Sequence, residues 1–426
     1  VAMGIDFYRN WQGAVGVDLR YVDLDRKMAT VAAELDLVDA AIRLDEIGWV
    51  KPAGDEGTAT VELQLNEARL ADIPAFAVDG GGLQLSGSAA FDPETATLRE
   101  VRLSQFQHGD TDIAADLTRT ADGGYAVSAR GPRLDARPLL ARATASTADT
   151  DDAAAGAAEE AAAEAESADV TPLQVTVAFD EVTASDDGTL FEVSGLAVRD
   201  PRGWNEFDLA ARTDTGQALR GRYEPVSAGD HQFTLNADDA GATLRALGIT
   251  SNLQGGQLRV SGVRQQRTGP LVGSIEMRDY RAVAMPALGR LLAALSLGGL
   301  ENVLSTEGLS FNRLNSGYTF ADDVLSLHDA RTAGGALGLT LNGEFDLGND
   351  RLRAEGTIVP IYGVNQLIGA IPILGTLLTG GAGQGVFAFA FSAEGPLREP
   401  VVTVNPLSVL APGLLRNMFF LDDRLG

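Results

Sequence analysis

Apolar and polar residues alternate with a period of two along most of the chain. In "GALGLTLNGEFD" the alternating apolar residues are Leu337, Leu339 and Leu341, and "GGQLRVSG" does the same with Leu258 and Val260. Successive side chains of a strand point to opposite faces of a sheet. The pattern therefore predicts strands with one apolar face and one polar or small face, and helical spacing fits these stretches poorly.

The predicted strands are separated by turns of one recurring form. "FDPETATL" (91–98), "FADDVLSL" (320–327) and "FDLGNDRL" (345–352) each place an aromatic residue and an Asp-containing polar turn before a Val or Leu strand. Such spacing is typical of hairpins. The sequence thus predicts a mainly β protein: a long antiparallel meander of about twenty consecutively joined strands. So long an open sheet is expected to curl.

Three segments depart from this pattern and predict short helical inserts. Residues 236–249 begin with Asn-Ala-Asp-Asp before Ala-rich helical spacing, which is a capped helix start. Residues 284–304 carry a leucine stripe behind Pro286. Residues 361–379 form the third insert and lie in a stretch, 356–393, that has no charged residue or histidine.

The uncharged stretch has two interpretations. It is either ordinary protein core or a cap that docks at a membrane or lipid surface. Its Pro and Gly residues interrupt the run of about twenty apolar residues that a membrane-spanning helix needs, so a span is disfavoured. The candidate membrane-facing or cap residues of the second and third inserts are Leu288, Leu291, Leu292, Leu295, Leu367, Ile368, Ile371, Leu374, Leu377 and Leu378.

Composition marks one division of the chain. Residues 143–169 hold eight acidic residues and no basic ones among many alanines. Such a segment cannot bury enough apolar surface to offset the entropy of ordering it. We therefore expect a disordered linker or loop at 143–169, between an N-terminal β region at 1–142 and a C-terminal β region at 170–426.

Charge and residue types argue against several functions. The net charge is −26, which repels phosphate backbones, so nucleic acid is not expected as a partner. The chain has no cysteine and only three scattered histidines, so no metal site is predicted. "GGAGQG" (380–385) lacks the Lys-Ser/Thr ending of a phosphate loop. No catalytic residue or nucleophile–base pair can be proposed, and we expect neither an enzyme nor a cofactor.

Two long segments resemble a known family. "NADDAGATLRALGITSNLQGGQLRVSG" (236–262) and "IPILGTLLTGGAGQGVFAFAFSAEGPLREPVVTVNPLSVLAPGLLRNMF" (371–419) are similar to the C-terminal region of AsmA-like envelope proteins of the YhdP type. "SARGPRLDARPLL" (128–140) resembles another phrase of the family. The resemblance covers in detail roughly the last 190 residues.

The resemblance implies a function. Proteins of this family, which are related to TamB and to bridge-like lipid transfer proteins, carry phospholipids between the inner and outer membranes along a U-shaped β-groove, or β-taco. It implies a periplasmic protein tethered to the inner membrane by an N-terminal anchor that this chain lacks, with phospholipids and the two membranes or their proteins as partners. The shorter length suggests a fragment of a longer protein.

The larger apolar residues of the predicted strands are the candidate groove lining. The alternative is a structural or interaction scaffold of the envelope whose apolar faces pack into a dry core. The pattern alone leaves open which face of the sheet is concave, because a slip of one residue reverses it. The candidates are Leu258, Val260, Ile275, Phe311, Leu337, Leu339, Leu341, Phe387, Phe389 and Phe391.

Overall fold

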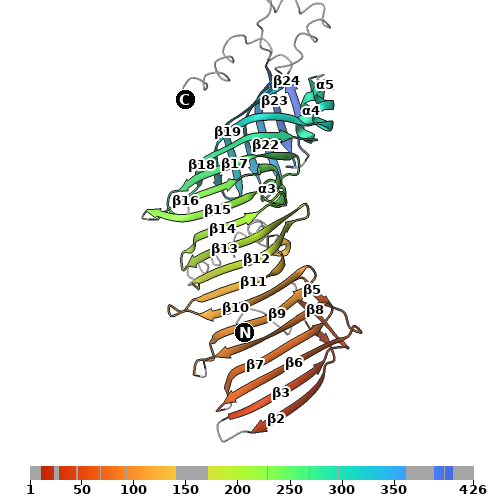
Figure 1. Cartoon of the computed structure of the whole chain (residues 1–426), viewed down its shortest axis with the longest axis vertical. Coiled ribbons are helices and arrows are strands. Elements are labelled where there is room, and N and C mark those ends of the chain that lie inside the picture. The colour runs from red at the N-terminus through yellow and green to blue at the C-terminus, as the bar shows by residue number, and fades with distance from the viewer. Residues whose placement is uncertain are drawn as a thin grey trace, which may run out of the picture. The chain divides into compact units, whose positions relative to one another are not determined.

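The chain forms one large, mostly antiparallel sheet of 21 strands, a separate three-stranded sheet and a few short helices in the computed structural model (Figure 1). The predicted fold class is confirmed. The sheet is open, since β2 pairs only with β3 and β24 only with β23 among the described strands. The structure describes residues 11–23, 28–44, 47–67, 69–92, 94–140, 171–227, 229–267, 269–295, 298–360, 388–397 and 399–405.

The chain divides into two compact units. Unit 1 comprises Val1–Arg142 and Ala154–Arg212, and unit 2 comprises Ala143–Ala153 and Thr213–Gly426. The strands of unit 1 are β1 (Trp11–Gly13), β2 (Gly16–Asp23), β3 (Met28–Asp36), β4 (Ala40–Leu44), β5 (Trp49–Lys51), β6 (Gly57–Asn66), β7 (Arg69–Gly80), β8 (Leu83–Phe91), β9 (Leu98–His108), β10 (Thr111–Arg119), β11 (Tyr125–Asp135), β12 (Leu173–Ser185), β13 (Gly188–Asp200) and β14 (Gly203–Arg212).

In the described part of the chain, unit 2 contains the remaining strands and three short helices. They are β15 (Ala218–Ser227), β16 (Asp230–Ala237), α3 (Ala240–Ala246), β17 (Leu253–Arg264), β18 (Leu271–Ala282), α4 (Pro286–Ala294), α5 (Gly298–Thr306), β19 (Leu309–Ala321), β20 (Val324–Gly334), β21 (Leu337–Asp346), β22 (Arg351–Pro360), β23 (Phe389–Gly395) and β24 (Val401–Asn405).

One strand pair departs from the predicted antiparallel meander. β11 and β12 run parallel, with Tyr125 opposite Leu173 and Ala129 opposite Val177. A parallel pair needs a crossover connection rather than a hairpin, and the chain between these strands contains the acidic segment 143–169. Both strands belong to unit 1, which extends to Arg212. The acidic segment itself lies outside the described residues.

The three predicted aspartate turns are hairpin turns. Asp92 Oδ1 accepts hydrogen bonds from the backbone N–H groups of Glu94 and Thr95, at 2.9 Å each. Asp322 and Asp323 both have positive φ, 48° and 58°, in the two-residue turn between β19 and β20. This is the geometry that matches the twist of the flanking strands.

A small separate sheet is formed by β1, at the start of the described chain, and by β4 and β5, which follow β3 and precede β6 in the sequence. Its centre is Lys51, which is fully buried and donates hydrogen bonds from Nζ to the carbonyls of Leu37 (2.6 Å), Ala40 (3.1 Å) and Pro52 (3.2 Å). Trp49, 2% exposed, donates from Nε1 to the carbonyls of Gly80 and Gly81 at 3.2 and 3.1 Å. These contacts attach the small sheet to the turn between β7 and β8.

The helices of unit 2 arise on one rim of its sheet, where β16 leads into α3 and β18 leads into α4. Asp239 caps α3 by accepting a hydrogen bond from Ala242 N, as the sequence predicts. The 284–304 insert forms two helices rather than one, with Pro286 at the start of α4. The 361–379 insert lies outside the described residues. Hairpins connect the strands at the opposite rim.

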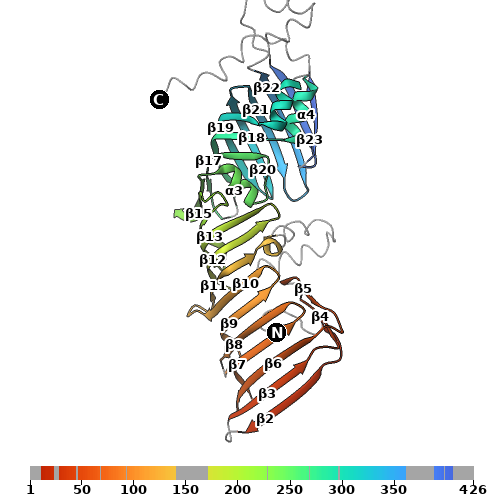
Figure 2. The same ribbon diagram turned by 45° about the vertical axis from the view of Figure 1, so that its right-hand side comes forward.

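The sheet of unit 2 is curled. β18 and β24 are six strands apart, about 29 Å in a flat sheet, yet α4, which follows β18 and is about 14 Å long, contacts β24. Arg290 of α4 donates to the carbonyl of Pro400, between β23 and β24, at 2.7 Å. Figures 1 and 2 both show α4 beside β23 at this end of the unit. The curl therefore brings strands that are distant in the sheet toward one helix.

We expect Trp49→Ala to release the small sheet. Truncating a buried tryptophan costs about 3–5 kcal/mol, and the two carbonyl contacts of Trp49 are lost as well. Hydrogen exchange followed by mass spectrometry should show faster exchange of β4 and β5, with β12 and β13 unchanged. Trp204→Ala is the control, because Trp204 is 53% exposed. Equal exchange in both variants would contradict the assignment.

Candidate functional site

The strand registers place the side chains of unit 2 on two faces of contrasting chemistry. Residues that are direct partners across neighbouring strands lie on the same face, as do residues two apart within a regular strand. Val260 is opposite Ile275, and Leu339 is opposite Ile358. Arg259, next to Val260, is opposite Glu276 and lies on the other face. We call these the apolar face and the outer face of unit 2.

The apolar face consists of rows that cross the sheet from strand to strand. The first row is Leu219, Ala237, Leu258, Met277, Leu314, Thr332, Leu339, Ile358 and Phe389. The second row is Tyr223, Phe233, Gly262, Gly273, Tyr318, Leu327, Gly343, Ala354, Ala393 and Val402. The rim row, beside the hairpins, is Pro225, His231, Arg264, Leu271, Phe320, Leu325, Phe345, Leu352 and Gly395.

All described groove candidates lie on the apolar face. Leu258, Phe311 and Leu337 are buried, at 5%, 3% and 1% exposed. The others are only partly buried, so the structure leaves apolar surface accessible between packed positions. The partly buried candidates are Val260, Ile275, Leu339, Leu341, Phe389 and Phe391. Phe387 lies outside the described residues.

The leucines of the second helical insert face the protein. Leu288, Leu291 and Leu292 of α4 are 6%, 3% and 0% exposed, and Leu295 at the end of the helix is partly buried. Because three of the four side chains are buried, α4 packs as a cap on the unit, and its leucine stripe leaves little surface to face a membrane. Leu367, Ile368, Ile371, Leu374, Leu377 and Leu378 lie outside the described residues.

Aromatic residues pack tightly on part of the apolar face. Tyr280 stacks on Phe311 with ring centroids 5.3 Å apart, and its hydroxyl is 2.7 Å from Thr332 Oγ1. Tyr318 is 4% exposed and its hydroxyl has no hydrogen-bond partner among the described residues. Burial raises the pKa of both Tyr280 and Tyr318 to about 12. These two phenols therefore lie in a medium that disfavours charge.

Unit 1 has an apolar face of its own. One row of cross-strand partners runs through every strand of its large sheet without a charged residue: Leu19, Ala33, Val61, Phe76, Gly87, Leu103, Ala115, Ala129, Val177, Gly195 and Leu209. A second row, Val17, Leu35, Ala59, Val78, Leu85, Phe106 and Ile113, lies beside it. On the edge strand β2, the side chains of Val17, Leu19 and Tyr21 are 60%, 60% and 59% exposed.

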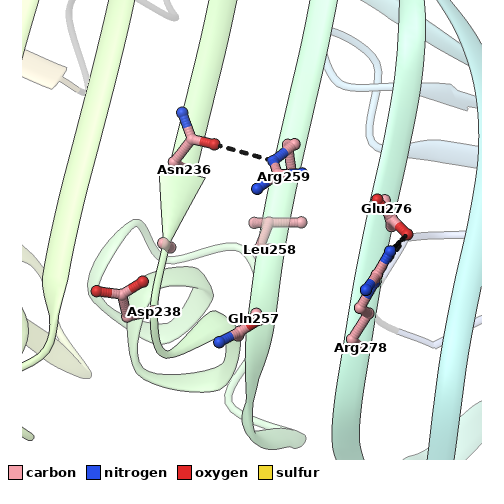
Figure 3. Close-up of a pocket in the computed structure, with 8 residues that line it drawn as sticks. Asn236, Asp238, Gln257, Leu258, Arg259, Glu276 and Arg278 are labelled. Carbon is pink, nitrogen blue, oxygen red and sulfur yellow. Dashed lines mark hydrogen bonds and ion pairs between the residues drawn. The ribbon is translucent and has the colours of Figure 1, made fainter.

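The outer face of unit 2 is polar and carries a shallow hollow (Figure 3). Arg259 donates from Nε to Asn236 Oδ1 at 3.3 Å, and Glu276 is ion-paired with Arg278 at 2.7 Å and Arg313 at 2.8 Å. Hydrogen bonds from Arg278 hold the pKa of Glu276 below its usual value. These groups satisfy one another in contact with solvent, as on an ordinary solvated surface.

The part of the chain that the structure describes contains neither a metal-binding cluster nor a helix that could span a membrane. No three His, Asp or Glu side chains lie close enough together to hold a metal ion. No helix there is long and apolar enough to cross a membrane.

The comparisons with known proteins identify no relative. No family model matches the chain, and neither a curated protein nor a solved structure matches it.

Several residues of the apolar faces were not among the sequence candidates. In unit 2 they include Leu314, Tyr318 and Ile358, and in unit 1 they include the whole apolar face. The signal was present, because the same period-two alternation runs through "VGVDLRYVDLD" in β2. Choosing among alternating residues required the cross-strand registers.

We expect the two buried tyrosines to respond differently to loss of the hydroxyl. Tyr280→Phe should cost about 1 kcal/mol, because its hydrogen bond to Thr332 is lost. Tyr318→Phe should be neutral or stabilising, because its hydroxyl has no partner among the residues that the structure describes. Chemical denaturation followed by circular dichroism tests both.

Alkaline titration provides a second measurement. Because the folded-state pKa values of Tyr280 and Tyr318 lie above the unfolded value, their contribution to stability is present below about pH 10 and is lost as pH rises through about 12. In a tyrosinate absorbance titration, each Phe variant should lose one late-ionising group. Ionisation of both near pH 10 in the folded protein would contradict their burial.

Proposed function

We propose that this protein is a non-catalytic envelope protein whose apolar β-surface binds phospholipid acyl chains and conducts them between the inner and outer membranes. The observation that carries the proposal is the apolar face of unit 2. Its first two rows contain no charged residue, and many of their large side chains are only partly buried. A partly exposed apolar surface of this extent is typical of a site that takes an apolar ligand.

Acyl chains match the apolar character and the length of this surface. Each methylene of a lipid that is removed from water contributes about 0.8 kcal/mol, so a bound chain needs apolar side chains along its whole length. The rows supply them from strand to strand, about 4.8 Å apart. Because no charge interrupts the first or second row, a chain moving along either row would meet no desolvated ion. The row through unit 1 has the same property.

The resemblance to AsmA-like proteins of the YhdP type supports a periplasmic location and both membranes as partners. The alternative function is an envelope scaffold with a dry core. The burial of Leu258, Met277 and Tyr318, at 5%, 6% and 4% exposed, favours it, since these positions are already packed. The two functions differ in whether the partly exposed residues are covered by lipid.

We expect Leu339→Asp to abolish lipid binding while the protein stays folded. Leu339 lies mid-sheet in the first row and is partly buried, so an aspartate there would put a charge where an acyl chain would lie. Lipid that co-purifies with protein isolated without detergent is measured by native mass spectrometry. Strand content is followed by circular dichroism.

Asn342→Asp is the matched control. Asn342 is exposed on the outer face of the same strand, and an aspartate keeps the oxygen that accepts from Asp329 N at 2.7 Å. This variant should retain lipid. If the wild-type protein carries none, or Leu339→Asp unfolds it, the dry scaffold is the better function.

A further inference from the structure

Arg264 is the only charged residue in the first, second and rim rows of the apolar face of unit 2. It ends β17, opposite His231 of β16 and Leu271 of β18. The other charged residues of β17 and β18 that have a register partner lie on the outer face: Arg259, Glu276, Arg278 and Arg281. Asp279 has no register partner, because its backbone has positive φ and the alternation resets there. Arg264 therefore requires an explanation that Arg259, on the outer face of the same strand, does not.

The guanidinium of Arg264 has no partner in the described part of the chain. Its Nε is buried and makes no hydrogen bond there, and no ion pair joins it to a carboxylate. The outer-face arginines behave differently, since Arg259 bonds Asn236 while Arg278 and Arg313 share Glu276. A partly buried cation without a hydrogen-bond acceptor is costly. An anion from outside the chain would offset that cost.

The surroundings of Arg264 define the kind of anion. Its neighbours are apolar or aromatic: Leu271 is 9% exposed, and His231 is 1% exposed and stacks on Tyr223 with ring centroids 4.8 Å apart. An arginine fork binds phosphate oxygens in pairs. Because the surface around Arg264 is apolar, the phosphate that fits there is one attached to an apolar chain.

We propose that Arg264 binds the phosphate of a phospholipid headgroup at the hairpin rim, with the acyl chains lying across the apolar face toward the helices. This inference rests on the proposed function and adds the lipid's orientation and its recognition through phosphate. From Arg264 to Leu258 is six residues along β17, or about 20 Å. One leaflet's acyl layer is about 15 Å deep, so a lipid anchored at Arg264 has its chains over the second and first rows.

The test compares two lipids with the same chains. Native mass spectrometry of the full chain is titrated with dipalmitoyl phosphatidic acid and with dipalmitoylglycerol, which lacks the phosphate. The wild-type protein should bind the phosphatidic acid at least about tenfold more tightly, the effect of one hydrogen-bonded charge pair. Arg264→Gln should remove that preference and leave the affinity for dipalmitoylglycerol unchanged. Arg259→Gln, which removes the same charge from the outer face, should keep it.

The outcomes separate this inference from the proposed function. If neither lipid binds the wild-type protein, the proposed function fails and this inference fails with it. If both lipids bind equally and Arg264→Gln changes nothing, the groove stands and the headgroup site is wrong. Glycerol 3-phosphate that binds as tightly as the phosphatidic acid would show a site for free phosphate instead. Should Arg264→Gln fail to fold, Arg264→Met decides, because methionine keeps an apolar stem and removes the charge: unchanged preference for the phosphatidic acid would overturn the inference.

Discussion

The register between neighbouring strands is the constraint on which the other features of this protein depend. A strand presents alternate residues to opposite faces, so its apolar set lies on one surface only if each partner is aligned to the residue. In unit 2 a slip of one position between β17 and β18 would bring Glu276 beside Val260 and Met277 beside Arg259. The apolar face would then contain charges in its middle rows. Register, rather than the hydrophobicity of any one strand, creates the surface.

Backbone irregularities keep the apolar residues of the long strands on one face of the sheet. The apolar residues change parity between Leu253 and Leu258, between Met277 and Tyr280, and between Leu327 and Ala330. At each change a residue with positive φ intervenes: Gly256 at 85°, Asp279 at 52° and Asp329 at 50°. Such positions reset the alternation and bend the strand. They allow Tyr280 and Phe311 to join the same face as Met277 and contribute to the curl of unit 2.

These resets explain what the sequence could and could not predict. Alternation within a strand is local, so the strand-rich class, the aspartate turns and the Asp239 cap of α3 follow from neighbouring residues. The parallel pairing of β11 with β12 depends on residues nearly fifty positions apart, and no local pattern encodes it. The sequence pattern does not single out apolar residues such as Leu314 and Ile358, because only the registers show that they share a row with Leu339. The candidates within 361–387 lie outside the described residues.

The placement of small and charged residues bears on how the apolar face would act. Gly262 and Gly273 are cross-strand partners in the second row, and a Cβ built on Gly262 would lie 2.4 Å from the hydroxyl of Tyr318. Because these two glycines have no side chain, the ring of Tyr318 can lie close over their strands. The second row therefore stays apolar at this point. The single charge of these rows, Arg264, is at the rim, where a cation reaches both water and the edge of the apolar surface. A core that only packs against itself has no need for an unpaired cation at its margin. A surface that orients an amphipathic ligand needs one charge there and none further in, and this is the distribution that unit 2 has.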